Sequence, residues 1–418
     1  FVQRYLVDLP NIRNVEPDPD NPGNRLVLLN KTEDALPSET RQYISANGLG
    51  FTNFDIKLNY DYWSTSDILQ SVLPSELVAT GAPASFATTG HIAHLNLRDE
   101  YLPYKHLIGK IVLDKNKNLR TVVNKVNTID DHDSEFRVFK MEVIAGEPDF
   151  NVVLNESDCS FVFDFSKVYW NSRLQAEHKR LIDMFQPGEV VVDGFAGVGP
   201  FAVPSAKKGC FVMGSDLNPE SAAALQGNAE RNKVTNRLRV ACKDGRVFIR
   251  EAVQEIWDNP IPFSEPSNLA KRRAKEERRA RESGNAGTRG IGREVEAPLP
   301  PPRRRVDHFV MNLPATAIEF LDAYRGVLAP LKEKDPGAFE QVYEDRMPMV
   351  HCYAFTRELD VSSAGADLRK RAEEYLGGAL GKDGEDVHYH LVRDVAPHKH
   401  MYCISFRLPR DIGLGRVG

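Results

Sequence analysis

The chain has 418 residues, of which 41% are hydrophobic and 27% charged, so it is long enough for two or three domains of ordinary soluble composition. No run approaches the roughly 18 apolar residues of a membrane span, so we expect no membrane contact. The formal net charge of −5 excludes a generally basic surface, and any nucleic acid must bind to local patches. Five scattered cysteines without a C-x-x-C pair argue against a zinc site, so we expect no metal, and they indicate a reducing compartment.

The first part of the chain predicts a small α+β domain at residues 1–75. Short strand-like runs occur at 26–29 and 54–58, and a helix-like segment occurs at 38–46. Proline, asparagine and aspartate separate these runs, as is typical of loops. The pattern alone assigns this domain no role.

Residues 80–166 predict a second, largely antiparallel domain. We expect strands at 91–97, 137–145, 151–155 and 159–164 and a helix at 101–110. His91 and His94 could suggest a metal site, but nothing nearby completes a ligand set. A structural role for both histidines is the simpler interpretation.

A helix is predicted to begin at Ser172, which forms a capping-box pattern with Gln175. Glu177 and His178 fall on or beside the apolar stripe of this helix. A buried, hydrogen-bonded histidine and a solvated glutamate would explain the same pattern. Because the helix directly precedes the strand described next, it is expected to lie against the ligand-binding edge of the sheet.

The stretch EVVVDGFAGVGPF, residues 189–201, predicts a nucleoside site. An apolar strand ends at Asp193, a glycine loop containing Gly197 follows, and Pro200 suits the first position of the next helix. A second strand then ends at Asp216, a carboxylate placed to accept the hydroxyls of a ribose. This arrangement is half of an open α/β sheet.

Three interpretations of this stretch stay open on its residues alone. Gly197, Gly199 and Ala202 also fit the G-x-G-x-x-A pattern of NAD-binding proteins. Asp193 would repel a pyrophosphate but attract the ammonium group of a methionine moiety, which favours S-adenosylmethionine. A purely structural α/β crossover is the third interpretation.

The remaining elements complete a Rossmann-like domain of class α/β at residues 167–418, with a seven-strand sheet and an antiparallel C-terminal hairpin. A strand at 238–242 ends at Asp244-Gly245, which could contact an adenine amine or form an ordinary turn. A basic, low-complexity insert at 259–305 predicts a disordered loop, either for RNA capture or as a tolerated expansion. A strand at 309–311 ends at Asn312, and further strands are expected at 349–355, 388–392 and 401–408 with helices at 315–325 and 367–375.

The residues after Asn312 restrict the methyl acceptor. No cysteine accompanies Pro314, so methylation of a pyrimidine carbon through a nucleophilic cysteine is disfavoured. Ala315 cannot stack on a base as the aromatic residue of an N-P-P-[YF] loop does. A ring nitrogen or another group remains as acceptor.

Taken together, V-Y-W-N-S-R-L…E-H, D-x-F-A-G-V-G-P-F, D-L-N-P and N-L-P resemble the eukaryotic and archaeal tRNA guanine-N1-methyltransferase family, in a fungal-type form with a basic insert. The resemblance implies transfer of the methyl group of S-adenosylmethionine to N1 of guanine 37 in tRNA, 3′ to the anticodon. It also implies a monomer whose first domain contacts the tRNA. Cytoplasm, nucleus and mitochondrial matrix are all compatible locations.

The resemblance also implies roles for individual residues. Glu177 would be the general base, and Arg137 and Asn312 would stabilise the negative charge that builds up on O6 of guanine. Basic patches for tRNA would include Lys167, Lys179 and Arg180 and residues 398–400. Substrate contacts would come from Tyr169, Arg173 and Pro314, and cofactor contacts from His178, Asp193, Phe195, Gly197, Asp216, Leu217, Asp244, Gly245 and Asn312.

Two rival functions remain. The related wybutosine-pathway enzyme transfers the aminocarboxypropyl group of the same cofactor, although Glu177 together with N-L-P favours methyl transfer. A non-catalytic RNA-binding protein with this fold should have lost the acidic strand ends, and Asp193, Asp216 and Asp244 are all present.

Overall fold

The computed structural model describes residues 3–79, 81–126, 136, 138, 140–261, 303–344, 346–384 and 386–416. The chain divides into two compact units, Phe1–Ala84 with Asp99–Asn116, and Ser85–Arg98 with Lys117–Gly418. The sequence predicts three domains, 1–75, 80–166 and 167–418, whose bounds differ from those of the two units. These domains stay a prediction. No helix among the described residues has both the length and the apolar character needed to cross a membrane.

The first unit contains short helices and one small antiparallel pair of strands. The predicted helix at 38–46 is confirmed, whereas residues 51–59 form no strand, so the strand expected at 54–58 is wrong. The elements are η1 Gln3–Tyr5, β1 Val15–Pro17, β2 Arg25–Val27, η2 Glu33–Ala35, α1 Ser38–Ala46, α2 Thr65–Val72, α3 Ser75–Val78, η3 Asp99–Tyr104 and α4 Lys105–Lys115.

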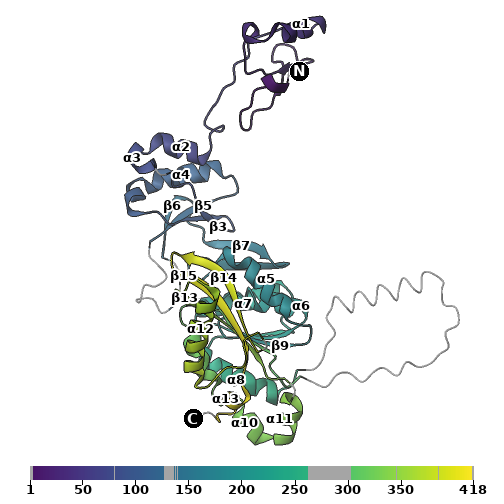
Figure 1. Cartoon of the computed structure of the whole chain (residues 1–418), viewed down its shortest axis with the longest axis vertical. Coiled ribbons are helices and arrows are strands. Elements are labelled where there is room, and N and C mark those ends of the chain that lie inside the picture. Colours follow the sequence, from purple (N-terminus) through teal and green to yellow (C-terminus); the bar gives the residue numbers. More distant parts are fainter. Residues whose placement is uncertain are drawn as a thin grey trace, which may run out of the picture. The chain divides into compact units, whose positions relative to one another are not determined.

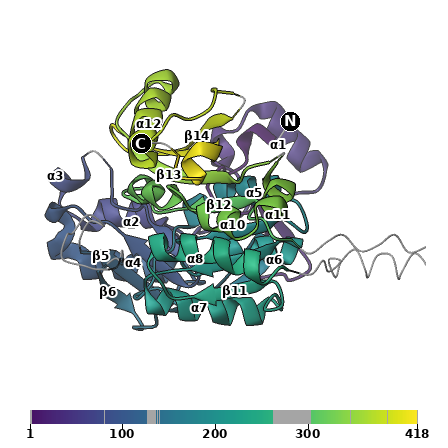
Figure 2. The same cartoon turned by 90° about the horizontal axis from the view of Figure 1, so that it is seen from below.

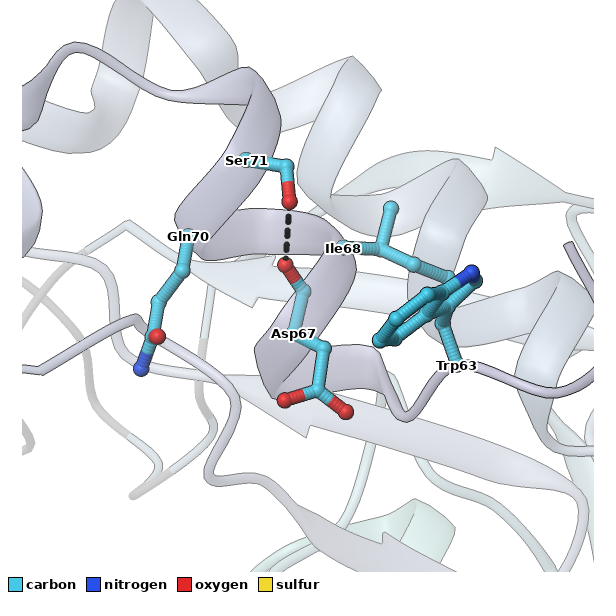
Figure 3. Close-up of a pocket in the computed structure, with 5 residues that line it drawn as sticks. All are labelled: Trp63, Asp67, Ile68, Gln70 and Ser71. Atoms are coloured by element: carbon cyan, nitrogen blue, oxygen red, sulfur yellow. Dashed lines mark hydrogen bonds between the residues drawn. The ribbon is translucent and has the colours of Figure 1, made fainter. Parts of the chain in front are cut away.

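A surface hollow lies beside α2 in this unit (Figure 3). The helix begins at a capping box in which Ser64 and Asp67 each bind the backbone N–H of the other, which satisfies two amides at its start. Ser71 donates to the carbonyl oxygen of Asp67 at 2.8 Å, a bond visible in the same view. The side chains of Asp67 and Ser71 in this hollow therefore bind backbone groups at the start of the helix itself.

The second unit begins with a small mixed sheet and a β-hairpin. The Nε2 atom of His91 lies 3.1 Å from the carbonyl oxygen of Asp149, and that of His94 lies 3.3 Å from the hydroxyl of Thr89, so both histidines have structural partners. The strands of the sheet are β3 Ala87–Thr89, β4 Ile92–Leu95, β5 Thr121–Lys125 and β6 Met141–Gly146, and the hairpin is formed by β7 Asn151–Glu156 and β8 Cys159–Asp164.

The seven-stranded sheet of the second unit confirms the predicted Rossmann-like architecture (Figure 1). Its strand order is β11-β10-β9-β12-β13-β15-β14, and the hairpin of β14 and β15, yellow in the figure, is antiparallel. The strands are β9 Val190–Asp193, β10 Phe211–Ser215, β11 Leu238–Ala241, β12 His308–Met311, β13 Met349–Thr356, β14 Val387–Ala396 and β15 Lys399–Arg407.

Helices cover both faces of this sheet (Figure 2). All four residues of β9 are buried, because a central parallel strand is covered on each side. One face packs against α5 Gln175–Met184, α6 Ala202–Lys208 and α7 Pro219–Arg231. The other face packs against α8 Gly245–Asp258, η5 Ala317–Tyr324, α10 Ala329–Lys334, α11 Pro336–Tyr343 and α12 Val361–Leu376. The short α13 Arg410–Gly413 is the last helix of the described residues.

Helical structure begins at Ser172 as predicted, but the capping box of Ser172 with Gln175 and the place of Pro200 as first helical residue are wrong. Before α5, the short helix η4 Ser172–Leu174 is capped by Asn171, whose side chain accepts from the amide of Arg173, while the hydroxyl of Ser172 donates to Thr88 instead of forming a capping box. Pro200 precedes α6, whose N-cap is Phe201. Asn171 belongs to the preferred N-cap residue types, whereas Phe201 caps α6 without a side-chain hydrogen bond.

The predicted insert at 259–305 lies outside the described residues except at its ends. There, Ile261 and Arg303 form an antiparallel bridge, with N–H to O distances of 3.1 and 2.9 Å in the two directions. The described residues on either side of the insert are therefore paired with each other where it leaves the fold.

Candidate active site

Four polar residues follow the strands on one edge of the large sheet. Asp193 ends β9, Asp216 follows β10, Asp244 follows β11 and Asn312 follows β12. These strands are parallel and adjacent, so their carboxyl ends lie along one edge. In open α/β sheets that edge is where ligands bind.

Asp193 is a buried carboxylate with one unsatisfied oxygen. Its side chain is inaccessible to solvent, Oδ1 accepts from the amide of Phe195 at 3.2 Å, and Oδ2 has no hydrogen-bond partner among the described residues. Burial, and then the charge of Asp216, raises the pKa of Asp193 to about 8. A ligand with a cationic group would supply the missing partner.

Asp216 organises the glycine loop. Its Oδ2 accepts from the amide of Gly197 and its Oδ1 from the amide of Asn218, both at 2.9 Å, and burial raises its pKa. Gly197 has a φ of +54° and Gly199 one of +99°. A Cβ at Gly199 would come within 2.6 Å of the side chain of Leu225, so the loop requires glycine there for conformation and space.

Asp244 caps α8, its Oδ1 accepting from the amides of Arg246 and Val247 at 2.9 and 3.3 Å. The structural role that the sequence left open is therefore present. At Gly245, a Cβ would lie 2.8 Å from the ring of Phe195, which packs edge-on against Phe320 at 5.0 Å. Gly245 and Phe195 are thus in direct contact at this edge.

Asn312 is the second residue of this edge with a buried, unsatisfied oxygen. Its Oδ1 has no partner within the described part of the chain. The following loop is fixed because the carbonyl of Pro314 accepts from the amide of Phe355 at 3.0 Å. Two unsatisfied oxygens, on Asp193 and Asn312, thus lie on adjacent strands of one edge, and this is the strongest structural sign of a ligand site.

Glu177 lies on α5 with its side chain 4% exposed. Arg180 donates to both of its carboxylate oxygens at 2.6 Å, and the hydroxyl of Tyr353 donates to Oε1 at 2.7 Å. The Nε2 atom of His390 lies 3.2 Å from Oε2. Arg180, which the sequence suggested as part of a basic tRNA patch, is therefore engaged with Glu177.

His178 is buried on the same helix. Its Nδ1 atom lies 2.5 Å from Oε1 of Glu156 on β7, and its ring packs edge-on against Phe201 at 4.8 Å. The histidine thus connects the hairpin to the end of the glycine loop. Its assignment as a cofactor contact stays a prediction.

Two of the predicted substrate residues, Tyr169 and Arg173, lie shortly before α5, whereas the third, Pro314, follows β12. Tyr169 is 36% exposed and its hydroxyl accepts from Asn171 at 3.3 Å, and Arg173 is exposed. Leu217 is 49% exposed on the loop after β10. Arg137 lies outside the described residues, so its predicted role rests on the resemblance alone.

Sequence reasoning missed two groups of supporting residues. Tyr353 and His390 come from strands far along the chain, and no local pattern connects them to Glu177. Asn228 of α7 is the second case, since it contacts two segments distant in the sequence. Its side-chain amide accepts from Val162 of β8 at 2.8 Å and donates to the carbonyl of Val198 in the glycine loop at 3.0 Å.

Comparison with known proteins gives the site a family. Residues 152–259 match the TRM5/TYW2 methyltransferase domain and residues 65–149 the TYW2 N-terminal domain. A tRNA (guanine(37)-N(1))-methyltransferase of Coprinopsis cinerea is 51% identical over 99% of this chain and 88% of its own length. The chain belongs to the tRNA (guanine(37)-N(1))-methyltransferase family. Another member, from Schizosaccharomyces pombe, is 41% identical over 98% of this chain and 88% of its own length.

Solved structures support the fold of this methyltransferase family. The crystal structure of Trm5b from Pyrococcus abyssi is 25% identical and superposes with a TM-score of 0.53 over 80% of this chain and 78% of that one. A structure described as the complex of aTrm5 and tRNALeu is 18% identical, with a TM-score of 0.60 over 97% of this chain and 94% of that one.

Proposed function

We propose that this protein transfers a methyl group from S-adenosylmethionine to N1 of guanine 37 in tRNA, with Glu177 as the general base. Family membership at 51% identity supports the reaction. The observation within the structure that carries the proposal is the pair of unsatisfied, buried oxygens on Asp193 and Asn312, at the edge where such a donor would bind.

The residues at this edge fit the donor. Asp193 offers a buried carboxylate oxygen to an ammonium group, and Asp216 is a second carboxylate at the end of the next strand. The amides and open space around Gly197 allow close approach of a ligand, since no atom lies within 4 Å of the position that a Cβ would take there. S-adenosylmethionine would supply an electrophilic methyl group at this edge.

The acceptor nitrogen requires a base. Guanine N1 carries a proton, which must leave as the nitrogen forms its new bond. Glu177 is a buried carboxylate that Arg180 and Tyr353 hold by hydrogen bonds, and it is the candidate acceptor of that proton. The amide of Asn312, and by resemblance Arg137, would stabilise negative charge on O6.

A methyl-transfer assay tests this proposal directly. Transcripts with G or A at position 37 are incubated with labelled S-adenosylmethionine, and the nucleosides are analysed by mass. We expect N1-methylguanosine from the G37 transcript only. A heavier aminocarboxypropyl product would instead select the wybutosine-type reaction, and no product despite donor binding would exclude both.

A further inference from the structure

The two carboxylate oxygens of Glu177 are not equivalent. Within the described residues, Oε1 accepts from Arg180 Nη2 at 2.6 Å and from the Tyr353 hydroxyl at 2.7 Å, whereas the hydrogen bond to Oε2 comes from Arg180 Nε at 2.6 Å. Each carboxylate oxygen offers about two lone-pair positions. Oε1 is therefore saturated, and Oε2 keeps one position for a further partner.

His390 lies beside the remaining lone-pair position of Oε2. Its Nε2 atom lies 3.2 Å from Oε2, and its side chain is 46% exposed on β14, the edge strand of the sheet. Burial, and then the charge of Arg180, lowers the pKa of His390, so the ring is mainly neutral near pH 7. A half-exposed, neutral side chain on an edge strand can rotate into solvent at little cost.

Tyr353, in contrast, is fixed. It is fully buried in β13, between β12 and β15. Its register partner is Cys403, and Cys403 is also the partner of His390, so the three residues form one row across three strands. On the other side of β13, Cys352 is the register partner of Met311 in the parallel strand β12. The residues that follow this pair, Asn312 and Tyr353, therefore lie next to each other where β12 ends.

The charged and titratable groups around Glu177 come from each element that packs on it. Arg180 comes from α5, Tyr353 from β13, Cys403 from β15 and His390 from β14. Burial raises the pKa of Cys403 to about 11 and that of Tyr353 well above its usual value. Both groups therefore stay protonated over the neutral range, and Tyr353 remains a hydrogen-bond donor.

We propose that Tyr353 is a positioning residue for proton removal: it fixes Oε1 of Glu177, so that Oε2 accepts the guanine proton after His390 turns away. In this step the N1–H bond breaks, its electron pair stays on the ring nitrogen, and the proton forms an O–H bond at Oε2. This inference rests on the proposed function, because it concerns the base of that reaction.

The test compares Tyr353→Phe with wild type in single-turnover methyl transfer across pH 5 to 9. Loss of a hydrogen bond to a charged group should slow the step about tenfold. The acidic limb of the rate profile should move to higher pH, because the charged carboxylate loses a donor. Tyr343→Phe is the control, since Tyr343 is equally buried but packs on the opposite face of the sheet.

A second variant tests the assignment of Oε2 independently of how Tyr353→Phe folds. In His390→Leu the acidic limb of the rate profile should move to lower pH, because protonated His390 no longer competes for Oε2. Loss of rate in His390→Leu with recovery by added imidazole would contradict this, since His390 would then carry the proton.

The possible outcomes distinguish the role of Tyr353 from the proposed methyl-transfer function. A wild-type protein that produces N1-methylguanosine together with an unchanged Tyr353→Phe profile would overturn the role of Tyr353 alone. A wild-type protein without that product would overturn the proposed function and this inference with it. Unchanged S-adenosylmethionine affinity in both variants would show that the effects arise after donor binding.

Discussion

Arg180 binds Glu177 through two parallel hydrogen bonds, Nε to Oε2 and Nη2 to Oε1, each 2.6 Å long. The two residues are one helical turn apart on α5, so a single element sets their geometry. The pair lies at the interior side of the helix, with the side chain of Glu177 4% and that of Arg180 29% exposed. Such a two-point pair fixes the orientation of the buried carboxylate.

Replacing Arg180 should therefore affect stability and rate differently. Arg180→Met leaves the carboxylate of Glu177 buried without its main partner and should lower the free energy of unfolding by about 3 kcal/mol. Arg180→Lys keeps the charge but loses the two-point geometry, so the rate of methyl transfer should fall more than stability. Urea unfolding and single-turnover rates on the same preparations measure both, and equal effects of the two variants would contradict a geometric role.

Asp193→Asn should stabilise the protein without donor while weakening donor binding. The raised pKa of about 8 means that the folded state binds this proton more tightly than the unfolded chain, for which 3.8 is the ordinary value. Stability from this group is thus present at low pH and lost as pH rises toward 8. The gain in melting temperature on substitution should be small at pH 5 and several degrees at pH 8. A lower melting temperature at pH 8 would show that Asp193 is a structural residue.

Donor affinity should depend on pH through the same residue. A cationic ligand group favours ionised Asp193, so binding of S-adenosylmethionine should release protons and strengthen as pH rises toward about 8. Calorimetry in buffers of different ionisation enthalpy measures that release. In Asp193→Asn the release should disappear, and its persistence would assign the proton to another group.

Gly245→Ala should weaken the donor site, because the new methyl group would lie 2.8 Å from the ring of Phe195. Phe195 is held by Phe320, so we expect a loss of about 1–2 kcal/mol in stability and a measurable loss of donor affinity. Gly227→Ala is the matched control, since nothing lies within 4 Å of its Cβ position in α7 and alanine favours helix. Similar effects at both glycines would contradict this account.

The fold was predictable where the hydrophobic periodicity agrees with the glycine and proline residues that mark the ends of strands and helices. The run from Val190 to Asp193 and the glycines that follow define the strand and loop, and the alternation of strands and helices indicates a largely parallel sheet. The segment 54–58 misled the prediction because its alternating side chains are not matched by a partner strand. β-strands depend on pairing that a single segment does not encode.

The site was predictable only for residues close to motifs. Asp193 and Asp216 end strands that the sequence identifies, so their gathering at one edge could be expected. Tyr353 contacts Glu177 across 176 positions of chain, and in the sequence it is one aromatic residue in an apolar strand. Such partners depend on tertiary register, which strand-level patterns leave open.

The most direct test of the account is the single-turnover rate of Glu177→Gln on a G37 transcript saturated with S-adenosylmethionine. If Glu177 accepts the guanine proton, the rate should fall by at least about a hundredfold while donor affinity stays at the wild-type value. A variant that forms N1-methylguanosine at the wild-type rate would contradict the assignment of Glu177 as the base, and the positioning role of Tyr353 would have to be withdrawn.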